Sequence, residues 1–224
     1  YFGRSYFFFM KAAPSGEKVV GIDLFEPGET ATQADPYAAL LAHGARLGLP
    51  VDRDLIIRAD SRLLAAPAIT EQCGKVRFFS IDGGHSLGHV KADSALARAC
   101  LADHGIIAFD DAHNPLWPEV TVGISDFIRE NRGGFCIVAF SRFKAYACRL
   151  EFRGLYRRVL MDSPFLDCLG KEEAEYLGSK ALFLRVPMRN RLLHEAFLRL
   201  GLPAIAERAF CMSAAPARKA DRDD

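Results

Sequence analysis

Aspartates follow four apolar segments in the first half of the chain, and their spacing suggests two kinds of chemistry. Asp23 ends VVGID, Asp60 ends LIIRAD and Asp82 ends FFSID, while the pair Asp110 and Asp111 ends IIAFDD. In an open parallel sheet, ligands bind beyond the carboxyl ends of the strands, so these acids are expected along one rim. A carboxylate in such a position can accept ribose hydroxyls, and several together can hold a hard cation.

Three of the acids suit a cation site. Asp82, Asp110 and Asp111 would supply three carboxylates from neighbouring strand ends, and Mg²⁺ prefers such oxygen ligands. Without a cation, the like charges would repel one another. His85 follows Asp82 through two glycines that we interpret as flexible, and an imidazole is suited to proton removal near neutral pH. We therefore predict Asp82 and His85 as catalytic residues, with His85 as the general base.

The remaining acids suit a nucleoside. Asp23 is predicted to accept the ribose hydroxyls, and Asp60 with Ser61, one strand over, to reach the adenine ring. A tight turn at Gly3, before a helix that begins near Ser5, would bring backbone close to the ligand. Each aspartate has an alternative interpretation, since an Asp after a strand commonly caps the next helix or closes an Asx turn.

The elements that must position these residues alternate between short apolar segments and longer helical ones. Strands are predicted at 19–24, 55–59, 76–81, 106–109 and 135–140. Helices are predicted at 35–47, 86–102 and 120–131, with Gly48 ending the first and Gly105 lying beyond the second. Apolar strands separated by helices indicate a parallel sheet covered on both sides, which is a doubly wound α/β fold.

The second half of the chain gives a weaker pattern. FKAYAC and KALFLRV resemble strands, and EFRGLYRRVLM and RLLHEAFLRL resemble helices, but their order in the sheet cannot be decided from the sequence. Trp117, just after the acid pair, is interpreted either as a cover over the substrate or as simple packing. We predict one domain over residues 1–212 and a disordered tail over 213–224, because the tail is small, polar and charged.

Composition limits the classes of partner. The 224 residues carry a formal net charge of +1, which argues against an electrostatic nucleic-acid binder or an anionic membrane surface. No apolar stretch approaches the ~20 residues needed to span a bilayer. The six cysteines show no CxxC pair or zinc spacing, which favours a reducing compartment and a cytoplasmic protein. Assembly into a homo-oligomer is left open.

The order strand-IDGGHS, helix, HGIIAFDDAHN resembles class I S-adenosylmethionine (SAM) dependent methyltransferases. It is most similar to the metal-dependent sugar O-methyltransferases of macrolide and aminocoumarin pathways, over roughly residues 1–145. The resemblance implies a Rossmann-like, mostly parallel sheet of seven strands, with the last strand antiparallel. It also implies that residues 1–5 are the tail of the glycine-rich SAM loop, and it implies the roles already given to the aspartates and His85, with Asp82 also touching the cofactor.

By the same resemblance, the first strand of the sheet and the acid that opens the SAM loop are missing from this sequence. The expected reaction is methyl transfer from SAM to a hydroxyl of a small molecule, a sugar or natural product, assisted by Mg²⁺. Three alternatives remain: a metal-independent methyltransferase, a non-catalytic SAM-binding domain, and an NAD(P)-dependent oxidoreductase. Asp23 would serve a nicotinamide ribose equally well, but the chain has no Tyr-xxx-Lys pair.

Overall fold

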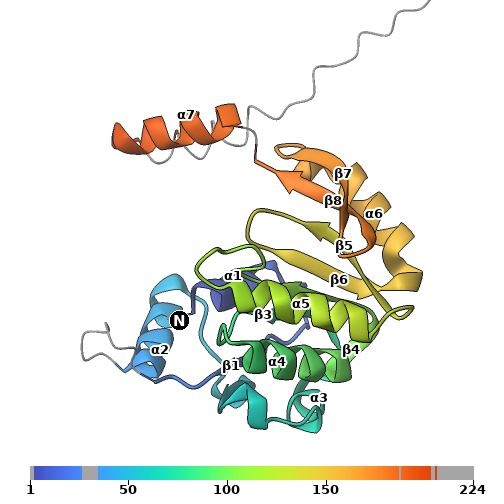
Figure 1. Cartoon of the computed structure of the whole chain (residues 1–224). Helices are drawn as coiled ribbons and strands as arrows, with labels where there is room; N and C mark the ends of the chain where they lie inside the picture. Colours follow the sequence, from blue (N-terminus) through green and yellow to red (C-terminus); the bar gives the residue numbers. More distant parts are fainter. Residues whose placement is uncertain (1–2, 27–34, 187, 203–204, 206–224) are drawn as a thin grey trace, which may run out of the picture. The chain divides into compact units, whose positions relative to one another are not determined.

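The computed structural model of the chain describes residues 3–26, 35–186, 188–202 and 205 (Figure 1). The chain separates into two compact units, Tyr1–Ile107 and Ala108–Asp224, and each is described by itself. The single domain over 1–212 therefore stays a prediction, and the expected tail over 213–224 lies outside the described residues. Within the described part of the chain, no helix has the length and apolar character needed to cross a membrane.

The first unit alternates helices and strands, as the sequence pattern predicts. Its elements are α1 (Arg4–Ala12), β1 (Gly21–Asp23), α2 (Pro36–Leu47), η1 (Arg53–Leu55), β2 (Ile56–Arg58), η2 (Ser61–Leu63), α3 (Pro67–Cys73), β3 (Val76–Ile81), α4 (Leu87–Cys100) and β4 (Leu101–Phe109). β1 and β2 pair in parallel, with Asp23 opposite Arg58, and β3 lies beside β4. Each predicted strand of this unit is present, and β3 has the predicted bounds.

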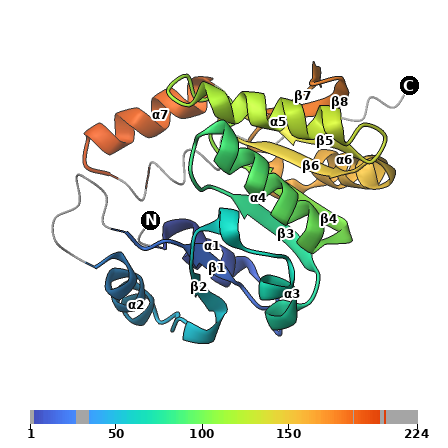
Figure 2. The ribbon, with the colours of Figure 1, turned by 60° about the horizontal axis from the view of Figure 1, so that its bottom comes forward.

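One apolar core holds much of the first unit together. Ile69 of α3 and Leu96 and Cys100 of α4 are buried, and Ile22 of β1 and Ile57 of β2 pack against them. α4 lies along β3 in this unit (Figure 2). η2, which follows β2, and strand β3 both contact α4, which is the arrangement that the site depends on.

The boundary between α4 and β4 differs from the prediction. The helix was expected to reach Ala102 and the strand to begin at residue 106, but the strand begins at Leu101, directly after the helix. Leu101 is buried with an extended backbone, whereas the polar side chains that follow it are exposed and conceal the strand pattern. Gly105 is therefore inside β4, where an added Cβ would lie 2.9 Å from the Val76 carbonyl oxygen of β3.

The second unit contains α5 (Pro118–Glu130), β5 (Phe135–Phe140), β6 (Ala145–Arg149), η3 (Leu150–Phe152), α6 (Arg153–Asp162), η4 (Pro164–Leu166), β7 (Gly170–Tyr176), β8 (Ser179–Arg185) and α7 (Met188–Arg199). Its strands lie in the order β6-β5-β8-β7. β5 is antiparallel to β6 and parallel to β8, and β7 and β8 form an antiparallel hairpin. The strand order that the sequence left undecided is thus given by the structure.

β5 forms the centre of the second unit. All residues from Phe135 to Ala139 are buried, and both α5 and α6 pack on this strand. The predicted α/β fold of Rossmann-like type is confirmed. The last strand was expected to be antiparallel, but β8 is parallel to β5, and the antiparallel pairs of this unit are β5 with β6 and β7 with β8. The described residues contain eight strands against the seven predicted, because β7, GKEEAEY, carries charges and no apolar pattern. The missing first strand stays a prediction.

Candidate functional site

Asp23 and Asp60 lie at the same end of the β1–β2 pair. The two strands run parallel, Asp23 is the last residue of β1, and its carbonyl oxygen accepts a hydrogen bond of 3.2 Å from the Ala59 amide. The Asp23 Oδ1 atom accepts a second bond of 2.8 Å from the Phe25 amide, which fixes the carboxylate in an Asx turn. The predicted convergence of these two acids is therefore found.

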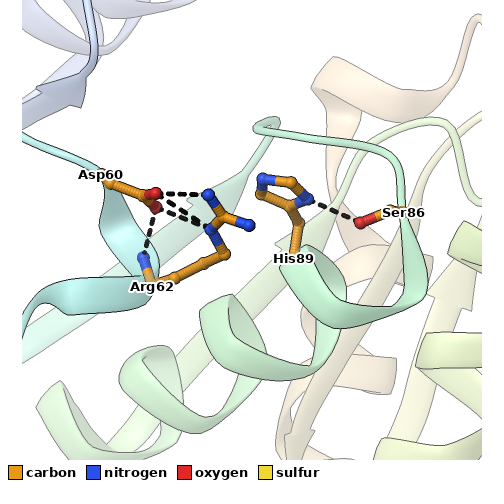
Figure 3. A network of polar contacts seen from close by, with 4 residues as sticks. All are labelled: Asp60, Arg62, Ser86 and His89. Atoms are coloured by element: carbon orange, nitrogen blue, oxygen red, sulfur yellow. Dashed lines mark hydrogen bonds and ion pairs between the residues drawn. The ribbon is translucent and has the colours of Figure 1, made fainter.

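Asp60 is engaged by its neighbour Arg62. Its Oδ1 atom caps η2 by accepting from the Arg62 amide at 2.9 Å, and its Oδ2 atom pairs with the guanidinium at 2.5 Å (Figure 3). Hydrogen bonds from the Arg62 side chain and backbone lower the pKa of Asp60 to about 2. The capping interpretation therefore applies to Asp60, whose charge is already balanced within the loop.

Ser61, the next residue, begins η2, which packs on α4. Asp93 on α4 is a buried carboxyl group with an exposed fraction of 6%. Its Oδ1 atom is buried without a hydrogen-bond partner. Burial raises the pKa of Asp93, and the nearby Ser61 side chain opposes that rise. The packing of η2 on α4 connects the loop after β2 to the helix that follows β3.

The loop after β3 rests on the same helix. An added Cβ at Gly83 would lie 3.0 Å from the Asp93 Oδ2 atom, and one at Gly84 would lie 2.6 Å from the His89 ring. The His89 Nδ1 atom is 2.6 Å from the Ser86 hydroxyl at the start of the helix (Figure 3). Both glycines are thus explained by close packing on α4, whereas the sequence interpretation treated them as a flexible joint.

The predicted catalytic residues flank these glycines. Asp82 follows β3 directly and is exposed, and His85 is partly buried and immediately precedes Ser86, the N-cap residue of α4. Both residues belong to the first unit and to the loop that packs on α4. The local geometry therefore places the predicted base beside the segment that carries Asp93 and His89.

The predicted turn at Gly3 is present. Gly3 adopts the left-handed conformation at the N-terminus of α1, and an added Cβ would lie 2.2 Å from the Leu40 Cδ1 atom. The glycine therefore permits close packing on α2, and Ser5 lies exposed in the first turn of α1. Tyr1 and Phe2, also assigned to the SAM loop by resemblance, lie outside the described residues.

The acid pair of the second unit is already bonded. The Asp110 Oδ2 atom lies 2.6 Å from the Lys144 Nζ atom, and its Oδ1 atom accepts from the Asp111 amide at 3.0 Å. Asp111 has a positive φ of 53°, and its Oδ1 atom accepts from the Asn114 side chain at 2.9 Å. Lys144 therefore supplies a positive charge to Asp110 from within the chain.

The chemistry of Asp82, Asp110 and Asp111 suits Mg²⁺, since all three side chains offer carboxylate oxygens. Asp82 belongs to the first unit and the acid pair to the second. Over residues 3–26, 35–186, 188–202 and 205, no group of three or more His, Cys, Asp or Glu side chains is arranged to hold a metal ion. A cation at Asp110 would have to replace Lys144. The cation site at Asp82, Asp110 and Asp111 therefore stays a prediction.

Sequence reasoning missed four side chains of these networks, namely Arg62, His89, Asp93 and Lys144. A signal was present for Asp93, because it shares the helical spacing of Val90, Ala97 and Cys100, all of which are buried. A charged residue in an apolar stripe indicates a buried polar group. Trp117 is the N-cap residue of α5 and is 42% exposed.

The chain resembles a known protein family and two solved structures. A family model described as "Methyltransferase domain" matches residues 1–112, which is half of the chain. The apo structure of CalS11, described as a TDP-rhamnose 3'-O-methyltransferase of calicheamicin biosynthesis, matches at 22% identity and a TM-score of 0.49, covering 66% of this chain and 68% of that one. A second structure of CalS11, a calicheamicin methyltransferase, matches at 20% identity and a TM-score of 0.46 over the same shares. No curated protein matches the chain.

Proposed function

Because this chain belongs to the methyltransferase domain family, we propose that it transfers the methyl group of S-adenosylmethionine to a hydroxyl of a small molecule. The acceptor class, a sugar or natural product, is what the resemblance of the IDGGHS and FDDAHN segments to sugar O-methyltransferases implies. The observation that carries the proposal is a set of contacts in the first unit. The Ala59 amide donates to the Asp23 carbonyl, η2 packs on α4, and Gly83 lies against Asp93 of α4. This set gathers three strand ends that a nucleoside cofactor would use.

The cofactor side of the proposed site consists of Asp23, Ser61 and the loop at Asp82. Asp23, fixed in its Asx turn, would accept the ribose hydroxyls. Ser61 would face the adenine ring, and Asp60 would hold the loop through its pair with Arg62. Gly3 and Ser5 would contribute backbone at the start of α1. These assignments remain part of the proposal.

The chemical step is an in-line displacement at the methyl carbon. The hydroxyl oxygen of the acceptor forms a bond to that carbon, the carbon–sulfur bond breaks, and the sulfonium becomes a neutral thioether. The hydroxyl proton passes to His85, which acts as the base beside Asp82. The main contribution of the chain is to hold nucleophile, methyl carbon and sulfur in line and to exclude water.

Mg²⁺ held by Asp82, Asp110 and Asp111 is a further part of this proposal, and proton transfer to His85 does not require it. When bound, a divalent cation would lower the pKa of the acceptor hydroxyl. The Lys144–Asp110 pair specifically favours the alternative of a metal-independent methyltransferase, because Lys144 already neutralises Asp110.

Two measurements test the reaction and its cation requirement. SAM, but not NAD, should raise the melting temperature of the chain, and incubation with SAM and hydroxylated acceptors should release S-adenosylhomocysteine. Stabilisation by NAD alone would contradict the proposal. For the cation, Mg²⁺ binding should be measured by calorimetry for the wild type and for Lys144→Met. Tighter binding by the variant, with activity lost in EDTA, supports the metal site. Full activity in EDTA supports the alternative.

A further inference from the structure

Helix α6 of the second unit exposes apolar side chains along its outer face. No residue of the helix is fully buried, and its exposed positions 154, 155, 158, 159 and 162 recur at the spacing of a single helix face. Leu155 and Val159 are the large apolar side chains of this face, with exposed fractions of 49% and 53%. Phe165, three residues beyond the end of the helix, is 89% exposed. We call Leu155, Val159 and Phe165 the α6 patch.

The inner side of the same helix is fixed to the sheet of the second unit. α6 packs on β5 (Figure 1), and Leu160 contacts the apolar core that β5 and β8 form. Arg157 forms an ion pair with Glu173 of β7, and the Lys171 Nζ atom donates to the Met161 carbonyl at 2.7 Å at the end of the helix. Because these contacts hold the helix from the inside, little order is lost when the outer face binds a partner.

The charged side chains of the outer face are opposite in sign. Arg158 and Asp162 are exposed and one turn apart, and neither is engaged in an ion pair within the described part of the chain. A cation that precedes an anion is the weaker order for a pair within one helix, so both charges remain available to a partner. A mixed surface of this kind does not suit an anionic membrane, which attracts clusters of Lys and Arg.

We propose that the outer face of α6 binds a second copy of this chain in a twofold-symmetric dimer with the two helices antiparallel. A twofold axis near residue 160 places Arg158 of each copy opposite Asp162 of the other, so the face is complementary to itself in charge. The same axis brings Leu155 towards the segment of the other copy that carries Phe165, and brings the two Val159 side chains close together.

The association is expected to be weak and reversible. One helix from each copy buries less surface than a standard interface, and interfaces at the small end of the range belong to transient complexes. Sedimentation equilibrium of the chain from about 1 to 100 µM spans the dissociation constants expected of such a dimer. It should show a monomer–dimer equilibrium.

Val159→Glu tests the α6 patch. The variant places a carboxylate from each copy in the apolar part of the interface, which should raise the dissociation constant about tenfold or more. Val122→Glu is the matched control, because Val122 lies on α5 of the same unit and is 48% exposed. The dissociation constant of the control should equal that of the wild type.

Charge reversal tests the antiparallel arrangement. Arg158→Asp and Asp162→Arg each create two like-charged pairs in the dimer, so each variant alone should associate severalfold more weakly than the wild type. An equimolar mixture of the two variants restores two opposite pairs in the mixed dimer. The mixture should therefore associate as the wild type does, and it gives a result even if Val159→Glu fails to fold.

Three outcomes would overturn the inference. The first is a wild-type chain that sediments as a monomer up to about 100 µM. The second is a dimer that Val159→Glu weakens no more than Val122→Glu does, which would place the interface elsewhere on the chain. The third is a mixture of Arg158→Asp and Asp162→Arg that associates no better than either variant alone, since the two charges would then not face each other across a twofold axis.

Discussion

Asp23 offers the most direct test of the cofactor site at the scale of a single residue. Asn at position 23 keeps the Oδ1 acceptor for the Phe25 amide, so the Asx turn should survive. It removes the charge and one acceptor oxygen that the ribose hydroxyls would use. We expect Asp23→Asn to weaken SAM binding about tenfold or more, because hydrogen bonds to charged groups are the stronger ones.

Calorimetry with SAM measures this loss, and Asp54→Asn provides a control at an exposed acid of the same unit. The control should bind SAM as the wild type does. Equal SAM affinity of Asp23→Asn and the wild type would remove Asp23 from the site while leaving the fold unaffected.

Asp93 carries the second prediction at this scale, which concerns stability and pH. Its pKa in the folded chain is raised above the usual 3.8 by burial. Between the usual and the raised value the folded state binds more protons than the unfolded state, so stability falls as pH rises through that interval. Below the usual value Asp93 is protonated in both states, so it causes no change of stability with pH there.

Asp93→Asn removes this titration. The melting temperature of the variant minus that of the wild type should therefore increase from pH 3.5 to pH 8, whatever its value at the acid end. Thermal unfolding of both proteins across this range gives the difference. A constant difference would mean that Asp93 titrates in the folded chain as it does in the unfolded one.

The parts of the candidate site that could be predicted from sequence are the positions of residues at the ends of strands. Asp23 and Asp60 share one end of a parallel pair, as the position of each after an apolar segment predicts. Lys144 could not be found in this way, because its pairing with Asp110 depends on a turn in which the Ser141 amide donates to the Lys144 carbonyl at 2.7 Å. Such a turn has no periodic signal.

At the scale of elements, the loop after β3 and helix α4 act together. The Gly84 position tolerates no side chain because the His89 ring occupies the space, only 2.6 Å from an added Cβ. Gly84→Ala should lower the free energy of unfolding by about 1–3 kcal/mol, the usual cost of overpacking. His89→Ala removes the ring, so the double variant should recover most of this loss.

Urea unfolding of the wild type, both single variants and the double variant measures the coupling. Gly88→Ala is the control, since Gly88 lies within α4 and an added Cβ there meets nothing within 4 Å. That variant should be neutral or stabilised by up to about 1 kcal/mol through helix propensity. Additive effects of Gly84→Ala and His89→Ala would show that the ring does not support the loop.

Element types were predicted well where apolar periodicity was continuous and poorly where charges interrupted it. β3 and β5 have the predicted bounds because VRFFSI and FCIVAF are mostly apolar and contain the β-branched and aromatic residues that favour strands. β7 was missed because GKEEAEY is paired on one side by β8, and its charged side chains are mostly exposed. Tertiary pairing therefore decides this strand, with little help from its own composition.

At the scale of the whole molecule, the chain consists of two compact units, each with its own core. Ile69, Leu96 and Cys100 are buried in the first unit, and Ala139, Leu182 and Leu184 in the second. The boundary between residues 107 and 108 falls inside β4, where no linker composition marks it. This division could not have been predicted from sequence, because it depends on long-range contacts.

The last prediction concerns where the cofactor acts within this division. Three contacts carry the proposed nucleoside site, namely Asp23 with Ala59, η2 with α4, and Gly83 with α4, and all belong to the first unit. Saturating S-adenosylhomocysteine should therefore slow amide hydrogen exchange in peptides that cover 21–25, 59–63 and 82–89, because a bound ligand suppresses local opening.

Mass spectrometry of exchanged peptides provides the measurement, with the β7–β8 hairpin at 170–185 as the internal reference. The hairpin lies in the second unit and is held by its own antiparallel register, so its exchange should not respond to the ligand. Slowed exchange confined to the second unit would contradict the placement of the cofactor at β1, β2 and β3. It would require a nucleoside site built from residues that the aspartate pattern does not indicate.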